Sequence, residues 1–204
     1  FCKCHLGHHP QFSPLRHGFD EFFGLPYSND MWPQHPEQVK AAADGAKRGG
    51  YPDLPLFDND KVAIATVTSQ EQNQLTRWYT EHAVDFIERQ HERPFFLYVP
   101  YNAVHWPFQP PDRPEPALTK ENAYQGTRRD CAAMLERVDA GVGMLLAELE
   151  KQGTLDNTLI VFSSDNGGER LSDNTPLFHH KQTLYEGGIR VPCLMRWPAR
   201  LPRG

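Results

Sequence analysis

The chain has 204 residues, of which 39% are apolar and 23% charged, and it carries a formal net charge of −5 with a pI near 6.1. A chain of this length and composition can bury a core of its own, whereas its acidic balance disfavours a nucleic-acid partner, which needs a basic face. It contains no apolar run close to the ~20 residues that span a bilayer and no targeting segment.

Residues 1–67 are predicted to be rich in loops, because prolines, histidines and glycines are frequent there and hydrophobic periodicity is weak. Within this segment, "AAADGAKRGGYPDLPLFDND" (41–60) is expected to form an exposed excursion. Residues 68–204, by contrast, are predicted to form α/β units.

A long amphipathic helix is predicted to begin at "TSQE" (68–71), which fits a capping box. Apolar side chains then recur at helical spacing over about five turns, and they are Leu75, Trp78, Tyr79, Ala83, Phe86 and Ile87. Pro94 follows the helix, and "FFLYV" (95–99) is typical of a buried strand.

A second helix is predicted over 126–152, with Gly153 placed to cap its C-terminus. Its core-facing side chains would be Met134, Leu135, Val138, Val142, Leu145, Leu146 and Leu149. "TLIVFSS" (158–164) and "VPCLMRW" (191–197) are predicted strands. Helices alternating with apolar strands indicate an α/β fold with a mostly parallel sheet flanked by helices.

Polar residues follow two of the predicted strands. Ligands bind beyond the carboxyl ends of the strands in such sheets, so we expect residues 102–107 and 165–168 to share one cleft. Asp165 and Asn166 offer a carboxylate and an amide oxygen, which are ligands that Ca²⁺ or Mg²⁺ accepts. The alternative is that "DNGG" is only a turn, since Asn-Gly is a common turn signal.

Two other side chains are candidates for chemistry. His105 lies in "NAVHWP", where Trp106 and Pro107 would hold it rigidly, as suits a general acid or base; the alternative is a surface or capping histidine. Lys181 lies in "KQTLYEGGIRVP", where two glycines and a strand return the chain to the sheet; the alternative is an ordinary solvated lysine.

Five blocks resemble, in their order along the chain, the sulfatases, the arylsulfatase-type members of the alkaline-phosphatase-like superfamily. They are "KCHLG" (3–7), "GFDEFFGLPYSNDM" (18–31), "PFFLYVPYNAVHWP" (94–107), "LIVFSSDNGG" (159–168) and "KQTLYEGGIRVPCLMRWP" (181–198). The resemblance implies an alkaline-phosphatase-like fold and hydrolysis of sulfate monoesters by a formylglycine nucleophile, with a bound divalent cation that is usually Ca²⁺.

The resemblance also implies roles for individual residues. Asp165 and Asn166 match the family's cation-binding pair. Lys181 matches a lysine that contacts the sulfate. His105 matches a histidine beside the ester oxygen of the leaving group, where a proton donor is needed.

Lys3 and His5 match the K-x-H motif next to the nucleophile, in which the histidine helps to eliminate sulfate, and Ser28 matches a serine that lines the substrate pocket. None of the cysteines is followed by the x-P-x-R of the formylglycine motif. The resemblance therefore implies an incomplete catalytic domain over residues 1–204. The formylglycine is expected upstream, and this fragment alone is expected to be inactive.

The alternatives are a phosphate or phosphonate monoester hydrolase of the same superfamily and a non-catalytic remnant. The partner is expected to be a small-molecule or carbohydrate sulfate ester, with aryl sulfates, sulfated sugars and glycosaminoglycans all open. Family members are mostly exported, so the resemblance implies a periplasmic, extracellular or lysosomal location.

Overall fold

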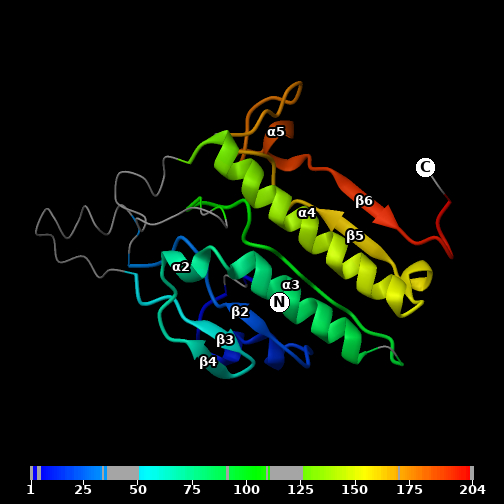
Figure 1. The fold of residues 1–204 in the computed structure, drawn as a ribbon. Helices are drawn as coiled ribbons and strands as arrows, with labels where there is room; N and C mark the ends of the chain where they lie inside the picture. The colour runs from blue at the N-terminus through cyan, green and yellow to red at the C-terminus, as the bar shows by residue number, and fades with distance from the viewer. Residues whose placement is uncertain are drawn as a thin grey trace, which may run out of the picture. The chain divides into compact units, whose positions relative to one another are not determined.

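The structure is a computed structural model that describes residues 2–3, 6–33, 35, 51–90, 92–108, 110, 126–169 and 171–202, with only the backbone for Cys2 and Lys3. The chain divides into two compact units, Phe1–Leu145 and Leu146–Gly204. Helices and strands are mixed along the chain (Figure 1), in agreement with the predicted α/β class.

The first unit contains a four-stranded sheet in the order β1 (Cys2–Lys3), β2 (Phe23–Leu25), β3 (Leu56–Asp58) and β4 (Lys61–Ile64). β1 and β2 are parallel, whereas β2–β3 and β3–β4 are antiparallel. Two short 3₁₀ helices, η1 (Pro10–Phe12) and η2 (Pro14–Arg16), precede β2. The segment predicted to be loop-rich thus carries all the described strands of this unit.

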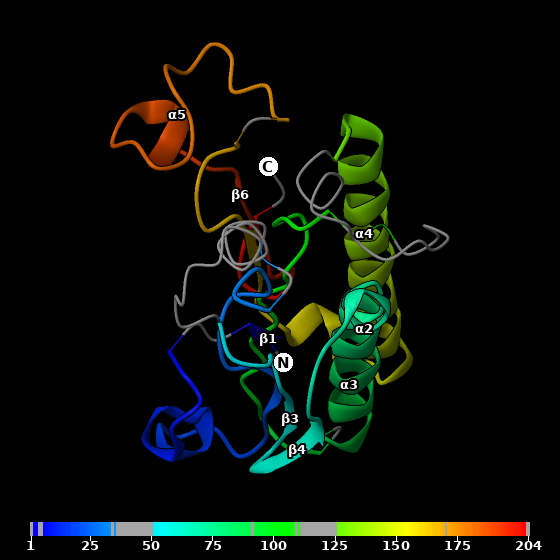
Figure 2. The same cartoon turned by 90° about the vertical axis from the view of Figure 1, so that its left-hand side faces the viewer.

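The core of the first unit lies between this sheet and helix α3 (Leu75–Arg89), and Figure 2 shows β3 and β4 beside that helix. The ring of Phe23 in β2 stacks on the imidazole of His82 in α3, with centroids 3.7 Å apart. Leu54 and Leu56 are fully buried in this core. The expected exposed excursion over 41–60 is therefore wrong for these two leucines, because burial on the sheet outweighs the turn signals around them.

The helix predicted from residue 68 is interrupted. α2 (Ser69–Gln72) has the predicted capping box: the Thr68 amide donates to Glu71 Oε2 at 2.7 Å, and the Gln70 amide donates to Thr68 Oγ1 at 3.3 Å. The Gln74 amide then bonds to the Glu71 carbonyl, a tighter i→i−3 contact that ends the first helix before α3 begins at Leu75.

Helix α4 (Arg128–Lys151) confirms the second predicted helix. Thr127 and Asp130 cap its start reciprocally, and Gly153, at φ 68°, ends it as predicted, with the Thr154 amide bonded to the Leu149 carbonyl. The prediction that Leu135 faces the core is wrong, since this residue is 54% exposed. None of the described helices is long and apolar enough to cross a membrane.

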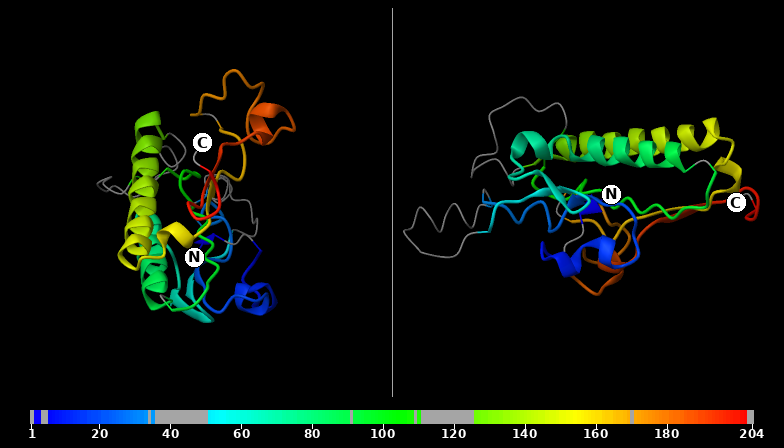
Figure 3. Two further views of the ribbon diagram at one scale, coloured as in Figure 1. Left: turned by 90° about the vertical axis from the view of Figure 1, so that its right-hand side faces the viewer. Right: turned by 90° about the horizontal axis from the view of Figure 1, so that it is seen from below.

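α3 and α4 run side by side in the same direction, as Figures 1 and 3 show. Gly141 allows this close approach, because a Cβ there would lie 2.5 Å from Thr80 Oγ1. The chain between them returns in the opposite direction, but residues 95–99 pair with no strand in the described part of the chain. Phe96 and Tyr98 are 74% and 58% exposed, so the prediction of a buried strand there is wrong.

In the second unit, β5 (Ile160–Ser163) pairs with β6 (Cys193–Arg196), and η3 (Leu155–Asn157) and α5 (Glu186–Ile189) complete the described elements. This pair is antiparallel. The described strand pairs therefore do not form a mostly parallel sheet. Among the described strands of residues 146–202, none pairs with the outer edge of β5 or β6. Val161 and Leu194 therefore remain exposed.

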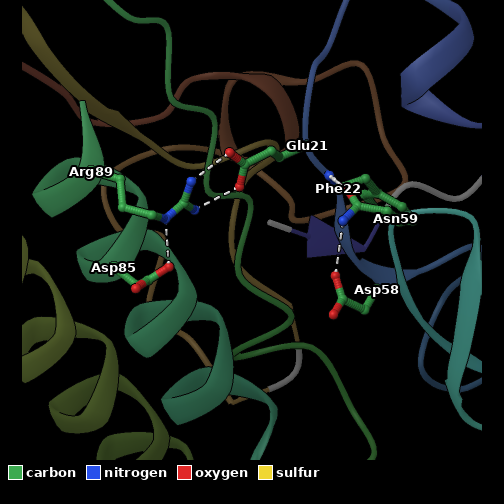
Figure 4. A network of polar contacts seen from close by, with 6 residues as sticks. All are labelled: Glu21, Phe22, Asp58, Asn59, Asp85 and Arg89. Atoms are coloured by element: carbon green, nitrogen blue, oxygen red, sulfur yellow. Dashed lines mark hydrogen bonds and ion pairs between the residues drawn. The ribbon is translucent and has the colours of Figure 1, made fainter.

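An ion pair connects the end of α3 to Glu21, two residues before β2 (Figure 4). Arg89 Nη1 and Nη2 donate to the two carboxylate oxygens of Glu21 at 2.8 and 2.7 Å, and Arg89 Nε donates to Asp85 at 3.0 Å. The hydrogen bonds from Arg89 hold the pKa of Glu21 below its ordinary value, against the opposing effect of burial. Asn59 Oδ1 accepts from the neighbouring Phe22 amide and ties the β3–β4 turn to the same place.

We predict a pH-dependent loss of stability for Glu21→Gln. Because the folded pKa of Glu21 is depressed, its stabilisation is present above the ordinary carboxyl pKa of about 4.3 and disappears as the pH falls through the folded value. The variant should unfold about 0.5–1 kcal/mol more easily at pH 7, and the difference should become smaller as the pH is lowered to 3. Urea unfolding at both pH values measures this, with Glu136→Gln on the exposed face of α4 as control; an equal difference at both pH values would contradict it.

Candidate functional site

The predicted site residues fall into two groups, one in each compact unit. Ser28 and His105 belong to the first unit, and Asp165, Asn166 and Lys181 belong to the second. His5 lies outside the described residues, and for Lys3 only the backbone, in β1, is described.

In the first unit, two buried polar side chains close to the predicted residues have no hydrogen-bond partner among the residues that the structure describes. Ser28 is 1% exposed, and its hydroxyl makes no hydrogen bond within the described part of the chain. Asn102, just after the predicted strand, is 6% exposed, and neither atom of its amide has a described partner. Buried polar groups are nearly always hydrogen-bonded, so both positions have capacity for a polar partner beyond the described contacts.

A buried amide network connects the loop after β2 to the segment that carries His105. Gln72 Nε2 donates to the carbonyl of Asn29 at 2.7 Å, and Asn29 Nδ2 donates back to Gln72 Oε1 at 3.1 Å. The same Asn29 Nδ2 lies 3.5 Å from the carbonyl of Trp106. Helix α2 is thus linked, through Asn29, to the carbonyl of the Trp106–Pro107 peptide.

The imidazole of His105 is oriented by its own neighbour. Its Nδ1 donates to the carbonyl of Trp106 at 2.7 Å, and its ring lies nearly parallel to the indole, at an interplanar angle of 13°. The His105 amide bonds to the carbonyl of Asn102 at 2.7 Å and closes the turn. Because Nδ1 is occupied by the carbonyl, proton transfer by this residue would fall to Nε2.

In the second unit, Asp165 and Asn166 follow directly after β5. The side chain of Asp165 is exposed and has no hydrogen bond or ion pair with the described residues, while Asn166 is half-buried. "DNGG" is not the corner of a two-residue hairpin, because the strand that pairs with β5 is β6, which begins only at Cys193. The turn-only alternative in its hairpin form is thereby excluded.

The two Gly-Gly pairs of this unit interlock through their backbones. The Gly167 amide donates to the Gly188 carbonyl at 2.9 Å. A Cβ on Gly167 would lie 1.9 Å from the carbonyl oxygen of Gly187, and one on Gly188 would lie 2.2 Å from that of Thr183. Only glycine permits this contact, and it fixes the turn after Asp165–Asn166 against α5.

Lys181 is attached to the same turn by its main chain. Its amide donates to the carbonyl of Gly168 at 3.0 Å, so the residue lies beside the segment that carries Asp165 and Asn166. Lys181 as a whole residue is half-buried, and its ammonium forms no ion pair among the residues described. The main chain thus brings Lys181 next to the glycine turn that follows Asp165 and Asn166. A carboxylate and an amide are groups that suit a cation, and an ammonium suits an oxyanion.

The donor set fits a hard divalent cation only in part. Asp165 and Asn166 supply oxygen ligands, the type that Ca²⁺ and Mg²⁺ take. No group of three or more His, Cys, Asp or Glu residues that could hold a metal occurs among the described residues. Because Ca²⁺ takes about six to eight ligands, these two residues account for only part of a coordination shell.

Sequence reasoning missed two features near the predicted residues. Gln72 and Asn29 gave no signal, because a buried amide pair that bridges 43 positions has no local pattern. The polar loop 169–180 between Gly168 and Lys181 was also missed, although its paired histidines could have drawn attention. Its residues line a cavity of about 460 Å³.

Comparisons with known proteins agree over nearly the whole chain. The model of the family described as Sulfatase matches residues 1–203. N-acetylgalactosamine-6-sulfatase of Canis lupus familiaris is 36% identical over 216 residues, which cover 99% of this chain and 37% of that protein. Arylsulfatase G of Rattus norvegicus is 34% identical, over 98% of this chain and 41% of that protein.

Solved structures are also similar to nearly the whole chain. The crystal structure titled Ps i-CgsB superposes with a TM-score of 0.75 at 36% identity, covering 98% of this chain and 44% of the other. Its complex with k-i-k-neocarrahexaose gives a TM-score of 0.73 at 35% identity. The chain thus spans about two fifths of the length of these relatives.

We predict opposite effects for two glycine-to-alanine substitutions. Gly167→Ala places a methyl group against the backbone of Gly187 and should destabilise the protein by about 2 kcal/mol or more. Gly143→Ala, in α4, has open space around its Cβ and should stabilise it by about 0.5–1 kcal/mol. Urea unfolding measures both effects. If Gly167→Ala leaves the free energy of unfolding unchanged, the backbone contact between the two Gly-Gly pairs is not tight.

A third prediction concerns the buried amide pair. Gln72→Leu removes both hydrogen bonds to Asn29 and should reduce the free energy of unfolding by about 1–3 kcal/mol. Gln70→Leu, on the exposed side of the same helix, should change it by less than about 0.5 kcal/mol. Hydrogen exchange of residues 102–108 should be faster only in Gln72→Leu; equal exchange in the two variants would remove the positioning role of Gln72.

Proposed function

This chain belongs to the sulfatase family, and we propose that the protein to which it contributes hydrolyses sulfate monoesters. The family match and relatives at 34–36% identity support this. The observation that carries it for this chain is the glycine turn of the second unit, which holds Lys181 beside Asp165 and Asn166. Such a turn supplies ligands for a cation and a positive charge for an anionic ester.

Asp165 and Asn166 would be ligands of a divalent cation, Ca²⁺ by family and Mg²⁺ as the alternative. The cation, when bound, supplies positive charge to the ester oxygens during sulfur–oxygen cleavage. The unpaired carboxylate of Asp165 supports this role, since no described cation neutralises it.

Lys181 would contact the sulfate, and its charge would stabilise negative charge that builds in the transition state. His105, held through Nδ1, would donate a proton from Nε2 to the leaving oxygen, a contribution of about 10²- to 10⁴-fold. Lys3, His5 and Ser28 complete the proposed set around the nucleophile and the substrate. The nucleophile itself would be a formylglycine outside residues 1–204.

The remaining family properties are part of the same proposal. The whole protein would have the alkaline-phosphatase-like fold of its structural relatives, with a mostly parallel sheet. Its substrate would be a small-molecule or carbohydrate sulfate ester, and it would be exported from the cytoplasm. The names of the relatives, which specify a sulfated amino sugar and a carrageenan oligosaccharide, support a sulfated carbohydrate.

The test is turnover by the full-length protein. We expect it to release 4-nitrophenol from 4-nitrophenyl sulfate much faster than from 4-nitrophenyl phosphate. Lys181→Ala should lower kcat/KM for the sulfate ester by about 10²- to 10³-fold, because it removes a charge aimed at the transition state. The matched control is Lys61→Ala, an exposed lysine in β4.

Faster hydrolysis of the phosphate ester would favour the phosphatase alternative. Absence of turnover with both aryl esters and with a sulfated carbohydrate would favour a non-catalytic protein. Equal activity of Lys181→Ala and Lys61→Ala would remove the role proposed for Lys181 without affecting the assigned family.

A further inference from the structure

Trp106 contacts the imidazole of His105 in two separate ways. Its carbonyl accepts a hydrogen bond from His105 Nδ1 at 2.7 Å, and its indole lies nearly parallel to the imidazole, at 13°, with ring centroids 5.8 Å apart. Because a carbonyl oxygen can only accept, Nδ1 must donate. The carbonyl thus determines which nitrogen is left for proton transfer, and the indole limits rotation of the imidazole out of its plane.

The backbone part of this contact is fixed independently of the indole. Pro107, which follows the carbonyl, is fully buried. Asn29 Nδ2 lies 3.5 Å from the same carbonyl oxygen, and Asn29 is itself bonded to Gln72. A substitution of the Trp106 side chain should therefore leave the acceptor for Nδ1 in place and remove only the ring contact.

The half-buried indole is supported by a second, buried histidine. The rings of Trp106 and His35 have centroids 5.7 Å apart, and His35 is 7% exposed. The His35 amide donates to the carbonyl of Trp32 at 3.0 Å, and Trp32 belongs to the hydrophobic core of the first unit. The indole therefore packs against a residue that is bonded to the core, and a ring held in this way can restrain the imidazole beside it.

This restraint bears on the step proposed for His105. To protonate a leaving oxygen while Nδ1 donates to the carbonyl, the ring must also carry a proton on Nε2, which is the imidazolium form. An aromatic face attracts a cation within about 6 Å of its centroid, so the indole favours this charged form as well as its orientation. As the sulfur–oxygen bond breaks, its electron pair stays on the leaving oxygen, which takes the proton from Nε2. A neutral imidazole with its proton on Nδ1 remains.

We propose that Trp106 is a positioning residue for the proton donor, which holds the plane of the His105 imidazole through its indole and serves mainly esters with a basic leaving group. The inference rests on the function proposed above. A weakly basic leaving group such as 4-nitrophenolate departs with little help from an acid, whereas a basic one requires the proton. The contribution of Trp106 to the rate therefore grows with the basicity of the leaving oxygen.

The experiment measures kcat/KM of the full-length protein for 4-nitrophenyl, 4-chlorophenyl and phenyl sulfate, whose leaving phenolates increase in basicity in that order. A general acid contributes about 10²- to 10⁴-fold in total, so Trp106→Leu should lower kcat/KM about 10-fold for phenyl sulfate and less than about twofold for 4-nitrophenyl sulfate. Trp106→Phe, which keeps a flat ring, should recover most of the loss.

Trp78→Leu is the matched control, since Trp78 is also half-buried but packs against the hydrophobic core of the first unit. Any effect of this control should be equal for the three esters. In the His105→Ala background, Trp106→Leu should change kcat/KM by less than about twofold, because the indole acts through the imidazole. No loss or an equal loss for all three esters in Trp106→Leu, or an undiminished loss in the His105→Ala background, would overturn the proposal.

A measurement that needs no turnover separates this inference from the proposed function. If the wild-type protein cleaves neither these esters nor a sulfated carbohydrate, sulfate hydrolysis fails, but the positioning role can still be tested by NMR with ¹⁵N-labelled histidine. The variant His105→Ala identifies the signals of His105. Exchange of the Nδ1 proton with water should be slow in the wild type and in Trp78→Leu, and about 10-fold faster in Trp106→Leu. Equal exchange in the wild type and Trp106→Leu, whether slow or fast, would overturn the proposal.

Discussion

The contact between two Gly-Gly pairs is the constraint on which the second unit depends. Gly167 meets the backbone of Gly187 and Gly188 at distances that exclude any side chain. Because the contact is made by main-chain atoms, it fixes the chain on both sides without using the neighbouring side chains. Neither Asp165 before the turn nor Lys181 beyond it forms an ion pair with another described residue.

The first unit positions its candidate group by a different device. There the buried amides of Gln72 and Asn29 contact the carbonyl of Trp106, and that carbonyl in turn orients the imidazole of His105. In both units a polar side chain lies on a segment without regular secondary structure. A short helix contacts that segment, α2 in the first unit and α5 in the second. This is the usual division between a rigid scaffold and functional loops.

Local signals explain most of what the sequence predicted correctly. Thr68 and Glu71 lie in one turn and Gly153 lies two residues beyond the end of α4, so their caps depend on residues that are close in the chain. Such features need no knowledge of distant partners.

Predictions that depended on distant partners were the ones that failed. The burial of Leu54 and Leu56 comes from pairing with β2 and packing on α3, which turn signals around them concealed. Residues 95–99 have the composition of a buried strand, but strand formation requires a neighbour, and none of the described segments supplies one. The cavity beside Glu169 likewise arises from chain folding between two glycine turns rather than from a motif.

The most direct test of the account is a crystal structure of the full-length protein with Ca²⁺ and sulfate. The account predicts a Ca²⁺ ion bound by side-chain oxygens of Asp165 and Asn166 at about 2.3–2.6 Å, with a sulfate oxygen within hydrogen-bond distance of Lys181 Nζ. A cation bound elsewhere, with the Lys181 ammonium directed to solvent and away from the sulfate, would contradict it.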